Sequence, residues 1–157
     1  MSTFTKWFLL NSVIVTALFF AEVKGALSTM IKSDSSYICL LIMVMYVVVS
    51  GVIGRFCYQA DGIKNSISDH AEAELLLKRT DVCWFIAEHF FSLGLLGTVL
   101  GLCIATAAGL NANAQISDII TGLKTGLHTA FYTTICGIIF SIPLQVQLMI
   151  LKFKLEK

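Results

Sequence analysis

Residues 90–110 read FFSLGLLGTVLGLCIATAAGL, twenty-one positions without a charged side chain. A helix of about 20 residues is long enough to cross a bilayer. Small residues recur through this stretch at Gly94, Gly97, Gly101, Ala105 and Gly109, and the last four are spaced four apart. That spacing puts small side chains on one helix face, where another backbone can approach closely. We therefore predict a membrane helix over 90–110 that contacts protein, and we expect Gly101→Leu to separate the subunits of an oligomer.

A second long apolar stretch lies near the end of the chain. No Asp, Glu, Lys or Arg occurs from residue 125 to residue 151, which predicts a membrane helix over about 121–151. Gly126, Ala130 and Gly137 supply small side chains for close helix packing. Pro143 lacks the amide that would donate to the Ile139 carbonyl, so we expect a kink there.

The remaining sequence predicts two more membrane helices, over about 7–23 and 37–54. The chain has 157 residues, of which 57% are hydrophobic and 13% charged, about half the charged share of soluble domains. The 25–36 segment is expected to be a short polar connection, and the helix over 37–54 to face lipid because its apolar character is all-round. The fold class is thus all-α: one membrane domain, residues 1–157, with four transmembrane helices.

Residues 55–88 form the one extended polar segment. Ile63, Ile67, Ala71 and Leu75 recur every four residues without a proline, which predicts a mostly helical extension of the neighbouring membrane helices. Its polar surface is interpreted either as a solvated helix face or as a docking surface for another protein.

The basic residues predict the orientation, since short cytoplasmic loops are enriched in Lys and Arg. Four helices put both termini and the 55–88 segment on one side. That side holds eight basic residues against three opposite: Lys6, Arg55, Lys64, Lys78, Arg79, Lys152, Lys154 and Lys157 against Lys24, Lys32 and Lys124. Both termini are therefore expected in the cytoplasm.

Several function classes are disfavoured by composition. A net charge of +1 argues against nucleic-acid binding. The five cysteines have neither zinc-site spacing nor a disulfide pattern, and no nucleophile–base pair or phosphate loop occurs. We expect no enzyme activity, no metal and no cofactor.

Two motifs resemble the MotA/TolQ/ExbB proton-channel family. LGLLGTVLGL at 93–102 is similar to its third-helix signature, and GLHTAFYTTICGIIFSIP at 126–143 is similar to its last helix. The resemblance implies an ion-driven rotary motor of the bacterial inner membrane: a homopentamer in membrane lipid around a dimeric, single-span partner of the MotB/TolR/ExbD type. The partner's aspartate would carry H⁺ or Na⁺ past Thr98 and Thr134, with Thr133 also lining the path.

Departures from the family pattern narrow this expectation. TolQ and ExbB carry a glutamate where this chain has Thr129, and many members enter the third helix through Ala-Pro, where this chain has Phe90 and Phe91. The 55–88 segment is too short for the domain with which flagellar stators push on a rotor. We therefore expect a minimal member that drives a machine other than the standard flagellar rotor.

Alternative interpretations remain for individual residues. The threonines could simply bond back to the preceding helical turn and pack. His128 could be an interfacial residue or a gate, and Glu22 could reach the lipid headgroups or take part in ion flow. Thr98 and Thr134 reach the same depth if the last helix extends into the cytoplasm, as Gln145 and Gln147 indicate. The alternative function is a structural or holin-like membrane oligomer without ion coupling.

Overall fold

The computed structural model describes residues 2–34, 36–63, 67–109 and 115–155. They form five helices and no strand. The helices are α1 (Thr3–Val23), α2 (Ala26–Ser33), α3 (Ile38–Gly62), α4 (Ile67–Gly109) and α5 (Ile116–Leu155). Four of these, α1, α3, α4 and α5, are long and apolar enough to cross a membrane. The predicted all-α membrane fold with four such helices is confirmed.

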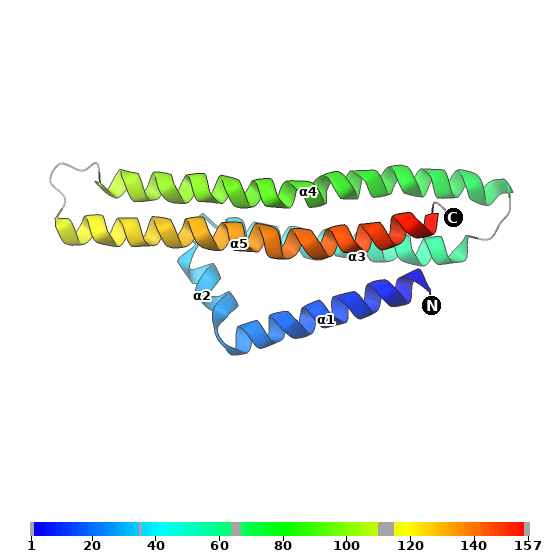
Figure 1. The fold of residues 1–157 in the computed structure, drawn as a ribbon, viewed down its shortest axis with the longest axis horizontal. Coiled ribbons are helices and arrows are strands. Elements are labelled where there is room, and N and C mark those ends of the chain that lie inside the picture. Colours follow the sequence, from blue (N-terminus) through cyan, green and yellow to red (C-terminus); the bar gives the residue numbers. More distant parts are fainter. Residues whose placement is uncertain (1, 35, 64–66, 110–114, 156–157) are drawn as a thin grey trace.

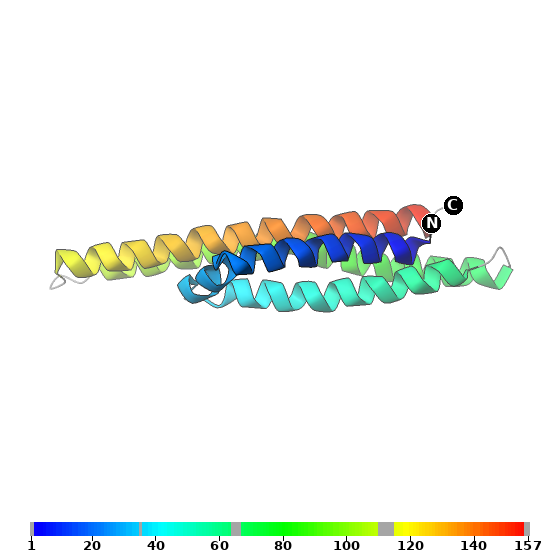
Figure 2. The same ribbon diagram turned by 90° about the horizontal axis from the view of Figure 1, so that it is seen from below.

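Helices α4 and α5 form the long axis of the molecule. They run antiparallel side by side, α3 packs against both of them, and α1 packs against α3 and α5 (Figure 1). Seen from below, α1 lies between α5 and α3 (Figure 2). The described residues of the 55–88 segment, apart from Ile63, are helical and belong to α3 and α4, in line with the prediction of a mostly helical segment. Helix α5 continues through Pro143 without ending.

The segment over 25–36 is not merely a connection, because it contains α2. Gly25 ends α1 with a left-handed backbone (φ +71°) that residues with a Cβ rarely adopt. Its N–H donates to the Glu22 carbonyl over 2.7 Å. The Glu22 carboxylate then accepts the N–H of Ser28 in α2 at 3.1 Å, and the exposed Glu22 thereby stabilises the start of this helix.

Residues 37–54 were expected to face lipid at the edge of the bundle, and one side of this helix is exposed while the other is buried. Helix α3 has one fully buried face, which includes Ile42, Ile53 and Cys57, while Val47 and Val48 on the other side are exposed. This face packs into the main buried cluster together with residues of α4 and α5. Helix α1 is instead the most exposed of the four, since Thr3 is the one buried residue of this fully described helix. An apolar helix buries whichever face its neighbours cover, and hydropathy alone does not reveal that face.

The α4–α5 pair extends past the other helices at the end where α4 ends and α5 begins (Figure 1). The Thr129 hydroxyl donates to the Ser33 carbonyl at 3.2 Å, which fixes the end of α2 beside that level of α5. Thirteen residues of α5 precede Thr129, or about 20 Å of helix at 1.5 Å per residue. At the opposite end, Cys83 and Ala87 of α4 join the buried cluster with α3. The segment over 78–88 therefore packs within the bundle rather than projecting alone.

Candidate functional site: the α4–α5 interface

The predicted small residues meet one another across the interface between α4 and α5. A Cβ added to Gly101 would lie 2.5 Å from the Gly126 carbonyl oxygen and 2.6 Å from the Ala130 nitrogen. A Cβ at Gly137 would lie 2.8 Å from the Phe90 carbonyl oxygen. Such distances leave no room for a side chain, so the two backbones are in direct contact. The same interface takes in Gly94, Gly97 and Ala105.

This contact lies inside one chain. The expectation that Gly101→Leu acts by separating subunits therefore needs correction, because the neighbour that fills the small face is α5 of the same molecule. Residues 90–110 do contact protein, but the partner is the adjacent helix in the fold.

Thr133 is enclosed in this interface. Its side chain is fully buried, and a Cβ at Gly97 would collide with it. The hydroxyl donates to the Thr129 carbonyl at 2.9 Å and the Ala130 carbonyl at 3.1 Å within its own helix. Thr133 therefore packs and bonds back to the preceding turn, and it is not available to an ion path along the surface of the subunit.

Thr98 and Thr134 occupy the edge of the interface and remain partly exposed. The Thr134 hydroxyl lies 3.5 Å from the Gly94 carbonyl oxygen and 3.2 Å from that of Ala130. The Thr98 hydroxyl donates to the Leu95 carbonyl at 2.5 Å. Thr134 lies beside Gly94, which precedes Thr98 by four residues, so the two threonines are offset by about one helical turn, or ~6 Å, along the α4–α5 pair.

His128 and its neighbour Thr129 lie in the first half of α5. His128 is half-buried, and its ring stands edge-on to Tyr132 with 5.7 Å between ring centroids. Thr129, at the family's glutamate position, is fully buried and bonds to α2. The His128 ring is therefore closer to the surface than the neighbouring threonine.

A buried polar cluster joins α1, α3 and α5, and sequence reasoning missed it. Gln147 is 1% exposed, and its Oε1 accepts from Trp7 Nε1 at 3.1 Å and from the Ser50 hydroxyl at 3.0 Å. Ser50 also lies 2.9 Å from Asn11 Oδ1, and the Gln147 amide nitrogen lies 3.5 Å from the Tyr46 hydroxyl. These bonds satisfy polar groups that would otherwise be costly to bury.

The cluster adds to the interpretation of Gln147. This residue was expected to indicate that the last helix extends past the bilayer into the cytoplasm, which stays a prediction, and the structure shows that its side chain lies inside the helix bundle. Asn11 and Gln147 were the available signal, because isolated amides within apolar stretches have to find hydrogen-bond partners. Their separation of 136 positions in sequence hid the pairing.

The four apolar helices belong to a multi-pass membrane protein. No curated protein and no solved structure matches the chain. The family model of the MotA/TolQ/ExbB proton channel family matches residues 58–157, which include all of α4 and α5. That match covers more than half of the sequence and contains both threonines at the edge of the interface. The chain therefore belongs to the MotA/TolQ/ExbB proton channel family.

Proposed function

We propose that the chain is the ring-forming subunit of a proton- or sodium-driven rotary motor in a bacterial inner membrane. Five copies surround a dimeric single-span partner of the MotB/TolR/ExbD type, and both termini of each copy lie in the cytoplasm. Ions move down their gradient past a partner-supplied aspartate, and the complex converts this flow into mechanical work. One charge crossing 100 mV releases about 2.3 kcal/mol, so work requires repeated passages.

Two apolar stretches of the sequence contain no acidic residue, which supports a carboxylate supplied by the partner. Residues 90–110 of the sequence and residues 125–151 contain no Asp, Glu, Lys or Arg. Threonine hydroxyls do not titrate near neutral pH, so they cannot take up and release a proton. They can donate and accept hydrogen bonds along the path of an ion that another protein carries.

The observation that carries the proposal is the placement of Thr98 and Thr134. They are partly exposed on two adjacent helices, about one helical turn apart at the edge of the α4–α5 interface. This arrangement offers a pair of hydroxyls to a group that passes along the surface of the subunit. Thr133 is omitted from the ion path because it is enclosed.

The exposed faces of α4 and α5 supply surface for assembly. Large apolar side chains are exposed on both helices, among them Leu96, Val99, Phe131, Ile135 and Ile138. A surface of this kind contacts lipid, neighbouring subunits or a partner helix in a membrane. These exposed faces can accommodate both a contact with the neighbouring subunit of the ring and a contact with the central partner.

Ion flux in vesicles tests the proposal. The chain is reconstituted with its single-span partner, and ion uptake is followed with a pH- or sodium-sensitive dye. Thr98→Val and Thr134→Val keep the side-chain shape but remove the hydroxyl, so each is expected to lower partner-dependent flux by about tenfold or more, the size of one hydrogen bond to a charged group.

Thr16→Val is the matched control. Thr16 lies on exposed α1, and its hydroxyl bonds only to the Ser12 carbonyl, at 2.8 Å, among the described residues. This variant should retain the parent flux. Parent-level flux in both Thr98→Val and Thr134→Val would remove these residues from the ion path. Equal flux with and without the partner would contradict the partner-supplied aspartate.

A further inference from the structure

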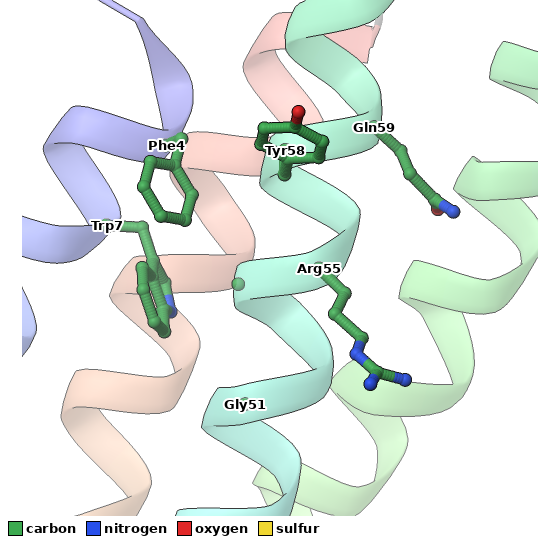
Figure 3. A pocket seen from close by; sticks show the side chains of 7 residues that line it. Phe4, Trp7, Gly51, Arg55, Tyr58 and Gln59 are labelled. Atoms are coloured by element: carbon green, nitrogen blue, oxygen red, sulfur yellow. The ribbon is translucent and has the colours of Figure 1, made fainter.

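A hollow of about 530 Å³ lies between the start of α1 and the later half of α3. Its lining residues come from these two helices, and none of them belongs to the α4–α5 interface: Phe4, Trp7, Gly51, Gly54, Arg55, Tyr58 and Gln59. Figure 3 shows Phe4 and Trp7 on one side of α3 and Arg55 and Gln59 on the other. The hollow therefore crosses the outer face of α3.

One wall of the hollow is aromatic and held in place. The Phe4 and Trp7 rings stack with 5.5 Å between centroids, and Tyr58 stands edge-on to Phe4 at 6.0 Å. The Trp7 nitrogen is fixed by its bond to buried Gln147, and the indole lies against Gly54, where a Cβ would come within 2.5 Å of it. Aromatic side chains of this type favour the boundary between lipid and water.

The floor of the hollow is open. A Cβ added to Gly51 would meet nothing within 4 Å. Gly51 falls in the uncharged stretch over 37–54, so the space above it continues toward the apolar part of α3. A hydrocarbon chain could lie across this backbone without meeting a side chain.

The opposite wall carries a cation without a counter-charge. Arg55 is the first charged residue after the uncharged stretch over 37–54, and it is exposed. Within the described ranges, no residue forms an ion pair or hydrogen bond with its side chain. The seven lining residues include no carboxylate. A guanidinium at this height matches the phosphate of a lipid headgroup in geometry and charge.

We propose that this hollow is a binding site for an anionic phospholipid. The phosphate binds the Arg55 guanidinium, Gln59 and the Tyr58 hydroxyl offer further hydrogen bonds, and one acyl chain crosses Gly51 beside Trp7. Basic pockets between membrane helices are suited to acidic headgroups. A zwitterionic lipid binds less well, because the lining has no carboxylate for its ammonium group.

Fluorescence quenching of Trp7 tests this site. The chain contains two tryptophans, Trp7 and Trp84, so a Trp84→Phe background isolates Trp7. This protein is placed in nanodiscs of unlabelled phosphatidylcholine that contain a small fraction of acyl-brominated phosphatidylglycerol or acyl-brominated phosphatidylcholine. We expect brominated phosphatidylglycerol to reach half-maximal quenching at an about tenfold lower fraction, the effect of one charge-assisted hydrogen bond.

Three variants locate the effect. Arg55→Gln should abolish the preference for phosphatidylglycerol, and Gly51→Leu should reduce quenching by both lipids because it fills the floor. Arg79→Gln removes an exposed arginine of α4 outside the hollow and should behave like the parent. Helix content measured by circular dichroism checks that each variant folds, and Arg55→Gln tests the proposal even if Gly51→Leu does not fold.

Several outcomes would overturn the proposal. Equal quenching by the two brominated lipids in the parent would show that the hollow does not select an anionic headgroup. An unchanged preference in Arg55→Gln would remove the proposed phosphate ligand. Absence of quenching by both lipids would mean that a second copy or another protein covers the hollow.

Discussion

Two glycines inside helices illustrate how strongly the surroundings decide the role of a residue. At Gly101 an added Cβ would lie 2.5 Å from the Gly126 carbonyl oxygen, whereas at Gly51 it would meet nothing within 4 Å. Both positions read as a glycine in an apolar stretch. One permits close contact between two backbones, and the other opens a hollow on the surface.

These two positions predict opposite responses to the same substitution. Gly101→Ala should destabilise the protein by about 1–3 kcal/mol, because the methyl group forces α4 and α5 apart. Gly51→Ala should be neutral or stabilising by up to about 1 kcal/mol, since alanine favours the helix and finds free space. Thermal unfolding in detergent measures both variants. Equal stability of the two would show that Gly101 is not in backbone contact with α5.

Asp34 fixes the junction between α2 and α3. Its carboxylate accepts the Ser36 hydroxyl at 2.6 Å, the Ser36 N–H at 2.9 Å and the Cys39 N–H at 2.8 Å. Burial disfavours the charged form, but the hydrogen bonds from Ser36 and Cys39 outweigh it and hold the pKa of Asp34 below its usual value. The charged carboxylate therefore stabilises the folded state.

This junction should respond to acid. Because the folded pKa lies below the unfolded one, the contribution of Asp34 is present above the unfolded pKa of about 4 and is lost as pH falls through the folded value. Asp34→Asn should lower stability near neutral pH and remove this part of the acid dependence. Unfolding at several pH values, with Asp118→Asn on α5 as the control, measures the difference. A parallel pH profile for Asp34→Asn and the parent would contradict the assignment.

At the scale of helices, α1 depends on polar attachments because it buries little apolar surface. The Asp61 carboxylate of α3 accepts the N–H groups of Thr3 and Phe4 at 2.8 Å each, which satisfies free donors at the start of α1. The buried cluster around Gln147 forms the second attachment through Trp7. The two attachments hold the aromatic wall of the lipid site against α3.

Removal of the second attachment should loosen α1 selectively. Gln147→Leu leaves the Trp7 indole N–H without its acceptor, at a cost of about 1–3 kcal/mol, while the Ser50 hydroxyl keeps Asn11 Oδ1 at 2.9 Å. Amide hydrogen exchange in detergent should become faster in α1, while α4 and the first half of α5 keep their protection. Gln145→Leu is the control, since the Gln145 amide bonds only to Ser141 within its own helix among the described residues. Unchanged exchange of α1 in Gln147→Leu would show that the cluster does not anchor this helix.

At the scale of the whole molecule, four apolar helices that each cross the membrane predict both chain termini on one side, and we expect that side to be the cytoplasm. Native Cys83 is buried and is therefore a poor labelling site for testing the orientation, whereas Lys78 and Lys32 are exposed. In a Cys103→Ser background, Lys32→Cys should react with an impermeant maleimide added to intact cells, and Lys78→Cys should react only after lysis. The reverse labelling pattern would mean that the orientation is inverted.

The number of membrane-length helices, the all-α class and family membership were predictable from the sequence, whereas the short helix α2 was not. Uncharged stretches long enough to cross a bilayer dictate helices, because an unpaired backbone in lipid is costly. The small residues at Gly97, Gly101 and Ala105 were recognisable as contact positions from their spacing. These properties depend on composition and short-range periodicity, which a linear sequence displays directly.

Only the tertiary structure decided which surfaces meet. It placed Thr133 inside the subunit and left Thr98 and Thr134 at the edge of the α4–α5 interface. It also brought Asn11 beside Gln147. In the hollow on α3, it placed Arg55 and the aromatic rings of α1 on opposite sides of Gly51, above which there is free space. These outcomes depend on the rotation and register of helices far apart in sequence. Many rotations of an apolar helix bury similar area, so side-chain packing and buried hydrogen bonds select one among them.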